Sequence, residues 1–158
     1  MLLEVFRELE QWIVTENEER KLTGTPLIGP CTIRILGQTA LIEALVQLHL
    51  VATQDVDAYL SGDQIIQTEF DRLLKSRGKE FDKDSYLIWM PIETEYSNVF
   101  TGRLITGQIA QPEYVLLSKA SKAPDKNKIL IKEFLSLGAT PTFLRLAKKY
   151  QLDLRQFV

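Results

Sequence analysis

The segments Leu36-Gly37-Gln38-Thr39-Ala40-Leu41 and Thr53-Gln54-Asp55-Val56-Asp57-Ala58 decide the fold that this sequence predicts. The first segment begins at the end of the stretch 32–36, which predicts a short strand ending at Gly37, and a helix rich in Ala and Leu is expected over about 39–49. The second segment lies within 53–60, which alternates enough to predict another strand. This part of the chain is therefore expected to form a strand, a tight glycine turn, a helix and a second strand.

The N-terminal region predicts an amphipathic helix over about 2–21. Its apolar residues recur at the i, i+3, i+4, i+7 spacing of one helical face: Leu2, Val5, Phe6, Leu9, Trp12 and Ile13. The following stretch, 23–30, is expected to be a loop because it contains two glycines and two prolines.

Beyond the second strand, Asp63 is placed to cap a helix that runs to about residue 76. The apolar segment 86–92 predicts a buried strand, and 102–109 predicts one or two more strands. Three helices are then expected over 112–122, 126–137 and 141–151.

The expected order of elements is α-β-α-β-α-β-β-α-α-α. It indicates a small mixed β-sheet flanked by helices, in the α/β or α+β class, with a helical C-terminal third. The sequence contains no repeat and no long linker. A single domain over 1–158 is therefore predicted, with an N-terminal helix (1–22), a sheet core (32–111) and C-terminal helices (112–158).

Asp55 and Asp57 are the first candidates for chemistry. Residues i and i+2 of a strand project to the same face, so the two carboxylates could share one or two hard cations, which prefer oxygen ligands. The same spacing recurs elsewhere among the 21 acidic residues, mostly on expected helices or in polar loops. Asp55 and Asp57 differ because they interrupt a strand, where a buried carboxylate needs a partner.

Gly37, Gln38 and Thr39 form the second candidate site. They lie where a strand leads into a helix, and free N–H groups at a helix start suit a phosphate. The structural alternative is a tight turn that needs glycine for its backbone angles.

Taken together, the two segments resemble the signature of the nucleotidyltransferase superfamily, in which an apolar-Gly-Gly/Ser turn and a helix precede Asp-apolar-Asp-apolar. The spacing resembles the branch of abortive-infection toxin-type nucleotidyltransferases and their uncharacterised relatives. Pro112-Glu113-Tyr114-Val115-Leu116-Leu117-Ser118-Lys119 is similar to a Pro-Glu-Asp-Leu-x-x-x-Lys helix of that branch. The stretch 122–128 is similar to the basic segment before its next helix, and the resemblance covers about 32–137.

The resemblance implies metal-dependent transfer of a nucleotidyl group from a nucleoside triphosphate. Asp55 and Asp57 would hold Mg²⁺ or Mn²⁺, and Glu93 or Glu95 would supply a third metal ligand. Lys119 would neutralise charge that develops in the transition state.

In the same resemblance, Gly37 and the amides of Gln38 and Thr39 would hold phosphates. Gln38 stands where the branch has Gly or Ser, and Asn127 stands where it often has Asp. These departures leave two alternatives open: a binding module of the same fold without catalysis, or the toxin of a toxin–antitoxin pair that modifies RNA.

Composition restricts the partners and the location. The formal net charge is -2, which argues against a general nucleic-acid-binding surface but leaves a local basic groove open. Cys31 is the only cysteine, the N-terminus lacks the basic start of a signal peptide, and no apolar run approaches the length of a membrane span. The expected protein is cytoplasmic, with no membrane partner. The resemblance implies a nucleoside triphosphate as a partner and leaves the acceptor open, with RNA and protein among the candidates.

Overall fold

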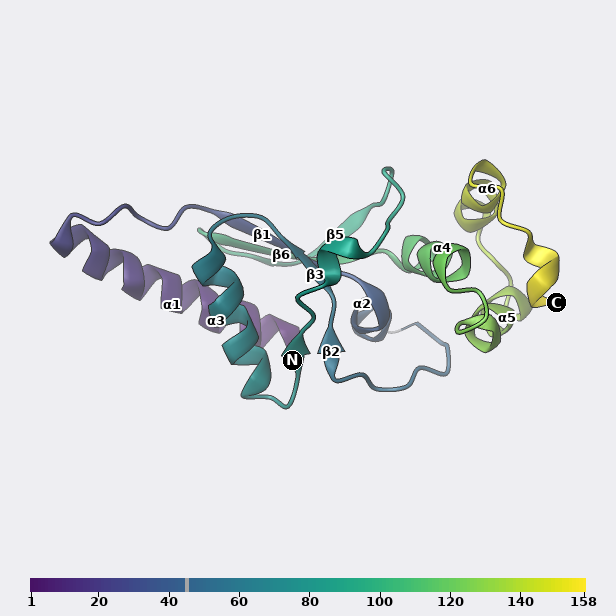
Figure 1. The fold of residues 1–158 in the computed structure, drawn as a ribbon, viewed down its shortest axis with the longest axis horizontal. Coiled ribbons are helices and arrows are strands. Elements are labelled where there is room, and N and C mark those ends of the chain that lie inside the picture. The colour runs from purple at the N-terminus through teal and green to yellow at the C-terminus, as the bar shows by residue number, and fades with distance from the viewer. Residues whose placement is uncertain (45) are drawn as a thin grey trace.

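The computed structural model describes residues 1–44 and 46–158, which form a mixed α/β structure (Figure 1). The helices are α1 (Leu2–Thr23), α2 (Gly37–Glu43), α3 (Gln64–Lys75), α4 (Pro112–Lys122), α5 (Lys128–Ser136) and α6 (Pro141–Lys149), with 3-10 turns η1 (Ser85–Leu87) and η2 (Leu154–Phe157). The strands are β1 (Cys31–Ile35), β2 (Asp55–Val56), β3 (Ala58–Leu60), β4 (Glu80–Phe81), β5 (Tyr96–Thr101) and β6 (Ile105–Ala110).

The main sheet has the strand order β3-β1-β6-β5. Strand β1 is parallel to β6 and antiparallel to β3, while β5 is antiparallel to β6. Along β1, Ile33 and Ile35 are buried whereas Arg34 is exposed, as expected for a strand with one face on the core. Helices α1, α2 and α3 lie on one side of this sheet (Figure 1). A separate pair, β2 and β4, is parallel.

Aromatic packing joins α1 to the sheet and to α3. The Phe6 ring lies 6.4 Å from the Phe70 ring and 6.3 Å from the Phe100 ring, between centroids. A Cβ atom at Gly107 of β6 would lie 2.4 Å from a Phe6 ring carbon, so glycine at this position lets the ring reach the strand. The sheet core and the N-terminal helix therefore share one hydrophobic cluster.

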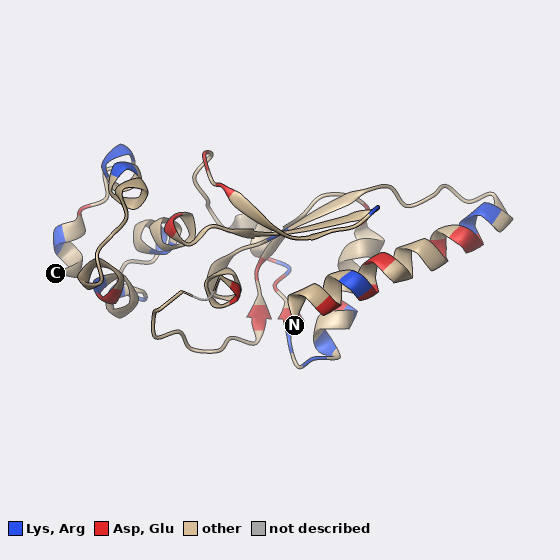
Figure 2. Cartoon of the chain, turned by 180° about the vertical axis from the view of Figure 1, so that it is seen from behind, with Lys and Arg blue, Asp and Glu red and all other residues tan. Residues whose placement is uncertain are grey.

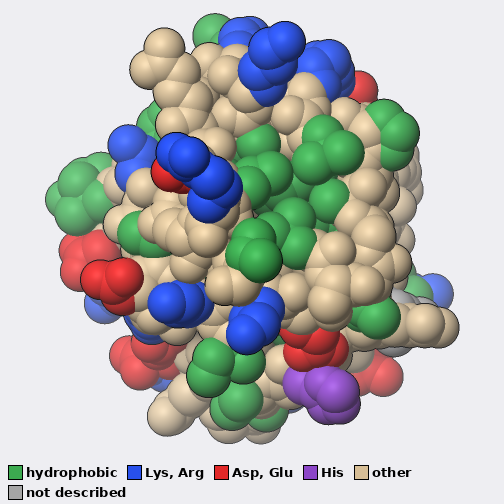
Figure 3. Space-filling model, turned by 90° about the vertical axis from the view of Figure 1, so that its right-hand side faces the viewer, with side chains coloured by type: hydrophobic (Ala, Val, Ile, Leu, Met, Phe, Trp, Pro, Cys, Tyr) green, Lys and Arg blue, Asp and Glu red, His purple; other side chains and the backbone are tan. Residues whose placement is uncertain are grey.

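The C-terminal helices pack at the other end of the sheet. Helix α4 contacts α2, α5 and α6, and the Phe134 and Phe143 rings join α5 to α6 at 4.9 Å. Residues 128–158 carry six Lys or Arg and two Asp or Glu, whereas acidic and basic positions are mixed along α1 (Figure 2). On the face at this end of the molecule, hydrophobic side chains gather in the middle, with Lys and Arg side chains around them (Figure 3).

Several predicted elements are confirmed. The N-terminal helix, the first strand and the helix after Asp63 are present, and the Asp63 carboxylate caps α3 by accepting from Ile65 N at 3.1 Å. The segment 102–109 proves to hold the turn and most of the second strand of a hairpin, β5–β6.

Two predicted elements have other bounds in the structure, and one strand was not predicted. The helix expected over 39–49 ends at Glu43, and Leu45 of that expected helix lies outside the described residues. The strand expected over 53–60 is divided at Asp57 into β2 and β3, and the two-residue strand β4 was not expected.

The buried strand expected over 86–92 is absent. Tyr86, Leu87 and Ile92 are exposed, and the segment has no strand neighbour. Two of its carbonyl groups are satisfied by side chains instead, since Ile88 O accepts from the Tyr59 hydroxyl and Trp89 O accepts from the Ser118 hydroxyl. An apolar run alone does not reveal which partners its backbone will find. Across the described residues, no helix has the length and apolar character that crossing a membrane requires.

Glu10 of α1 fastens the turn between β5 and β6. Its carboxylate accepts hydrogen bonds from the backbone N–H groups of Arg103 at 2.8 Å, Leu104 at 3.1 Å and Ile105 at 2.7 Å. One side chain thus satisfies three consecutive backbone donors and holds the hairpin against the N-terminal helix.

We predict that Glu10→Ala lowers the free energy of unfolding by about 1.5–3 kcal/mol, because it leaves charge-assisted backbone donors without their acceptor. Urea unfolding followed by circular dichroism measures the change. Glu8→Ala is the matched control: its side chain is 52% exposed and pairs with Arg77, so its loss should cost less than about 1 kcal/mol. Equal losses in the two variants would contradict the role assigned to Glu10.

Candidate functional site

The turn from β1 into α2 is built around Gly37. Its φ angle is +60°, a region that glycine adopts without the strain other residues suffer. A Cβ atom at this position would lie 2.4 Å from Oδ2 of Asp57, so the aspartate carboxylate occupies the space that a side chain would need. Gly37 is therefore required both for the turn and for the approach of Asp57.

Asp57 is held in place by its backbone on both sides. Its carbonyl accepts from Leu36 N at 2.8 Å, and the next amide, Ala58 N, donates to the buried Ser85 hydroxyl at 3.1 Å. These bonds divide the expected strand at Asp57 and fix the carboxylate beside the β1–α2 turn.

Asp82 lies beside Asp57 because the two residues follow neighbouring parallel strands. The pairs Asp55–Glu80 and Val56–Phe81 are in register, and Asp82 N donates to Val56 O at 2.9 Å. Since carboxyl ends of parallel strands meet at one edge, the next residues, Asp57 and Asp82, come together, and Asp82 contributes to raising the pKa of the Asp57 carboxyl.

The pKa of the Asp57 carboxyl is raised to about 6. Burial is the largest cause; the hydrogen bond and charge of Asp82 and the charge of Asp55 act in the same direction, while Lys119 opposes them. Because this pKa lies close to neutral pH, the Asp57 carboxyl can release its proton when a cation binds beside it.

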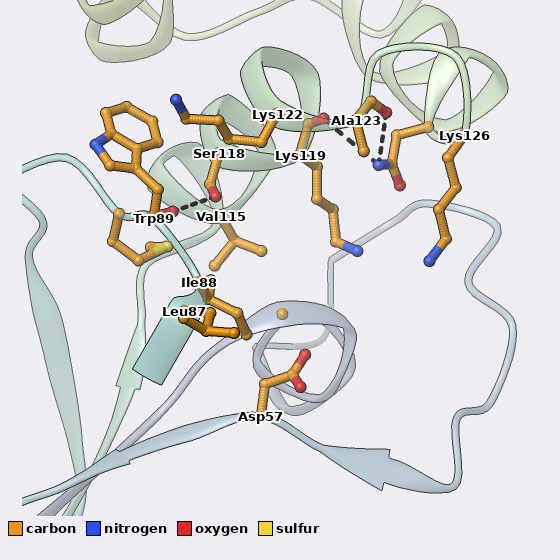
Figure 4. A pocket seen from close by; sticks show the side chains of 13 residues that line it. Asp57, Leu87, Ile88, Trp89, Val115, Ser118, Lys119, Lys122, Ala123 and Lys126 are labelled. Atoms are coloured by element: carbon orange, nitrogen blue, oxygen red, sulfur yellow. Dashed lines mark hydrogen bonds between the residues drawn. The ribbon is translucent and has the colours of Figure 1, made fainter. Parts of the chain in front are cut away.

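Lys119 of α4 enters the same site from the opposite side. Burial lowers the pKa of its ammonium group, the Asp57 charge raises it and Lys126 lowers it further. Figure 4 shows Lys119 and Lys126 pointing toward the end of the cavity where Asp57 lies. A desolvated ammonium facing a carboxyl is an arrangement that recurs at functional sites.

These groups surround an open cavity of about 480 Å³. Its lining comes from the β1–α2 turn, the strand break, the segment after η1, helix α4 and the link to α5: Gly37, Asp57, Leu87, Ile88, Trp89, Met90, Val115, Ser118, Lys119, Lys122, Ala123, Lys126 and Asn127. Parts of the chain that are far apart in sequence therefore build one site, with a polar half and an apolar half.

A second cavity of about 540 Å³ adjoins the first and shares Lys119, Lys126 and Asn127 with it. Gln38 lines this second cavity, and its amide donates to Val51 O at 3.1 Å, so the side chain turns away from Asp57. The Asn127 amide donates to the carbonyls of Lys119 and Ala123 at the end of α4, which gives it a capping role.

The structure brings together only some of the residues that the sequence singled out. Gly37, Asp57 and Lys119 meet in the first cavity, whereas Asp55 is exposed outside its lining and acts on Asp57 through charge. Thr39 is buried within α2 and lines neither cavity.

Glu93 and Glu95, the expected third metal ligands, lie outside both linings. The Glu93 carboxylate pairs with Lys149 and accepts from the Tyr150 hydroxyl; these hydrogen bonds lower its pKa to about 2. Within residues 1–44 and 46–158, no group of three or more His, Cys, Asp or Glu side chains is arranged to hold a metal ion.

Sequence reasoning missed Asp82 and Lys126 as members of the site. Asp82 was grouped with solvated loop acids because β4 is too short to show a periodic pattern. The sequence signal that could have identified Asp82 is the apolar Phe81 directly before it, which the structure buries. One apolar residue followed by an acid can mark the end of a short strand.

Comparison of the chain with protein-family models, curated proteins and solved structures finds no match in any of the three.

We predict a pH dependence of stability that originates from Asp57. Its pKa is raised from 3.8 to about 6 on folding, so the protonated carboxyl contributes stability that is complete below about pH 3.8 and is lost as the pH rises through about 6. Asp57→Asn stays neutral, so its stability relative to the native protein should rise between pH 4 and 6.5, by on the order of 1 kcal/mol after solvent screening.

Thermal unfolding in EDTA at half-unit pH steps measures this difference. Asp84→Asn removes a charge from an exposed neighbour and should leave the native pH profile unchanged. A constant difference between Asp57→Asn and the native protein from pH 4 to 7 would contradict the assignment.

Proposed function

We propose that this protein is a nucleotidyltransferase that binds a nucleoside triphosphate with Mg²⁺ and transfers its nucleotidyl group to an acceptor hydroxyl. The observation that carries the proposal is the meeting of Gly37, Asp57 and Lys119 in one cavity, although they are contributed by separate elements. The resemblance of their sequence segments to the nucleotidyltransferase signature supports the same function.

The carboxyl groups of Asp57 and Asp82 fit a divalent cation. They offer hard oxygen ligands; burial raises the pKa of Asp57 most, and the neighbouring Asp82 carboxyl raises it further. Mg²⁺ is commonly held by one or two carboxylates together with substrate phosphates and waters, so a pair is sufficient. In this proposal Asp82 replaces Glu93 and Glu95 as the partner of Asp57.

The ammonium groups of Lys119 and Lys126 fit the phosphates. Both line the cavity and point toward its Asp57 end (Figure 4), where a triphosphate bridged to a cation would lie. Lysine binds phosphate as a point charge, and the attraction between the two charges is stronger where water is partly excluded, as around Lys119.

The transfer forms a bond between the acceptor oxygen and the α-phosphorus and breaks the bond from that phosphorus to the oxygen that bridges to the β-phosphorus. Pyrophosphate leaves with that oxygen, and the carboxylate pair takes the hydroxyl proton. Mg²⁺, when bound, supplies charge neutralisation on the phosphates. Lys119 stabilises the charge that develops on the phosphoryl oxygens, and both RNA and protein carry acceptor hydroxyls of the required kind.

The test is isothermal titration of Mg²⁺-ATP into the native protein and into Asp57→Asn. We expect a dissociation constant between tens of micromolar and millimolar for the native protein, which is about 4–6 kcal/mol of binding free energy. Asp57→Asn should weaken binding at least about tenfold, because a hard cation loses one of its charged ligands. Asp84→Asn is the charge-matched control and should bind like the native protein.

Equal affinities for the native protein and Asp57→Asn would contradict the metal role of Asp57. If nucleotide binds in the predicted way but α-labelled nucleotide is never transferred to RNA or protein acceptors, the catalytically inactive binding module would replace the enzyme.

A further inference from the structure

The first cavity is divided into two chemically different halves. Asp57, Lys119 and Lys126 form the polar half. The apolar half is formed by Leu87, the last residue of η1, by the following residues Ile88, Trp89 and Met90, and by Val115 of α4. Figure 4 shows Leu87, Ile88 and Val115 between Asp57 and the more distant Trp89. A ligand with its phosphates at the polar half would therefore extend its other end over apolar side chains.

Several polar backbone groups along the apolar half are engaged within the protein. Ile88 N donates to Ser85 O at 3.0 Å, and Ile88 O accepts from the Tyr59 hydroxyl. Trp89 O accepts from the hydroxyl of Ser118, which is the one hydroxyl among the lining side chains. These groups hold the segment in place and are not left to recognise a ligand.

Three side chains near this half also have contacts within the protein. The ammonium group of Lys122 lies 5.0 Å from the centre of the Trp89 ring, and the Tyr150 ring packs edge-on against Trp89 at 5.2 Å. The Asn127 amide donates to two carbonyl groups of α4 and its end. The apolar half thus offers flat apolar contact and few groups able to read the edge of a nucleobase.

We propose that this apolar half is a nucleobase subsite that accepts all four common bases with little preference. The inference rests on the proposed function, because the phosphates and cation position the nucleotide. Stacking against the face of a base depends little on which base it is, since every base has an apolar π-face. Strong discrimination needs protein groups that hydrogen-bond to the base, and a site without them selects only weakly.

The test uses the fluorescence of Trp89. The chain has two tryptophans, so Trp12→Phe leaves Trp89 as the only one. This variant is titrated with Mg²⁺ and each of ATP, GTP, CTP and UTP, and separately with inorganic tripolyphosphate, with calorimetry in parallel. We expect the four dissociation constants to agree within about tenfold. Tripolyphosphate should bind more weakly than all four and leave the Trp89 emission unchanged.

Leu87→Ser tests the apolar contact itself. Leu87 is 69% exposed, so its replacement spares the core, and we expect it to weaken all four nucleotides about three- to tenfold without affecting tripolyphosphate. Tyr86→Ser is the matched control: Tyr86 is the neighbouring residue, is 73% exposed and lies outside the lining of this cavity. It should leave every affinity unchanged.

The outcomes separate this inference from the proposed function. A preference of more than about a hundredfold for one base, or tripolyphosphate binding as tight as nucleotide binding, would overturn the nucleobase subsite while the phosphate and metal site stands. Equal effects of Leu87→Ser and Tyr86→Ser would also overturn it. Failure of every phosphate ligand to bind with Mg²⁺ would remove the proposed function and this inference together.

Discussion

The contact between Gly37 and Asp57 is the constraint on which the site depends. The Asp57 carboxylate lies where a side chain at position 37 would be, and the Asp57 carbonyl accepts from Leu36 N. This contact joins the β1–α2 turn to the break between β2 and β3. Any other residue at position 37 would have to adopt an unfavourable φ angle and displace the carboxylate at the same time.

From that point, charge and burial explain the rest of the site. The strand break places Asp57 at the cavity and next to Asp82, and burial together with this neighbouring carboxyl favours the protonated form of Asp57. Lys119 reaches the same cavity from α4, at an energetic cost that its lowered pKa reflects. The protein thus holds the opposite charges of Asp57 and Lys119 in partly desolvated surroundings. In water, the attraction between them would be screened and weak.

The two halves of the cavity are formed by different kinds of structural element. The polar half depends on the sheet and on α4, whose positions are set by the hydrophobic core. The apolar half depends on the segment after η1, which forms no ladder and whose carbonyl groups accept from the hydroxyl groups of Tyr59 and Ser118. Because those hydroxyls belong to β3 and α4, the course of the segment depends on where the tertiary structure places both elements.

The sequence by itself determined the elements with strong local signals. The apolar stripe of α1, the Asp63 cap of α3, the glycine turn and the limits of α4 follow from periodicity and capping, which act over a few residues. It also pointed to Gly37, Asp57 and Lys119. Only the tertiary structure decided that Asp82 joins Asp57, that Glu93 pairs with Lys149 instead, and that 86–92 lines a cavity rather than a sheet. The physical reason is that these outcomes depend on which distant group satisfies a carboxylate or a backbone carbonyl, and local sequence does not encode that partner.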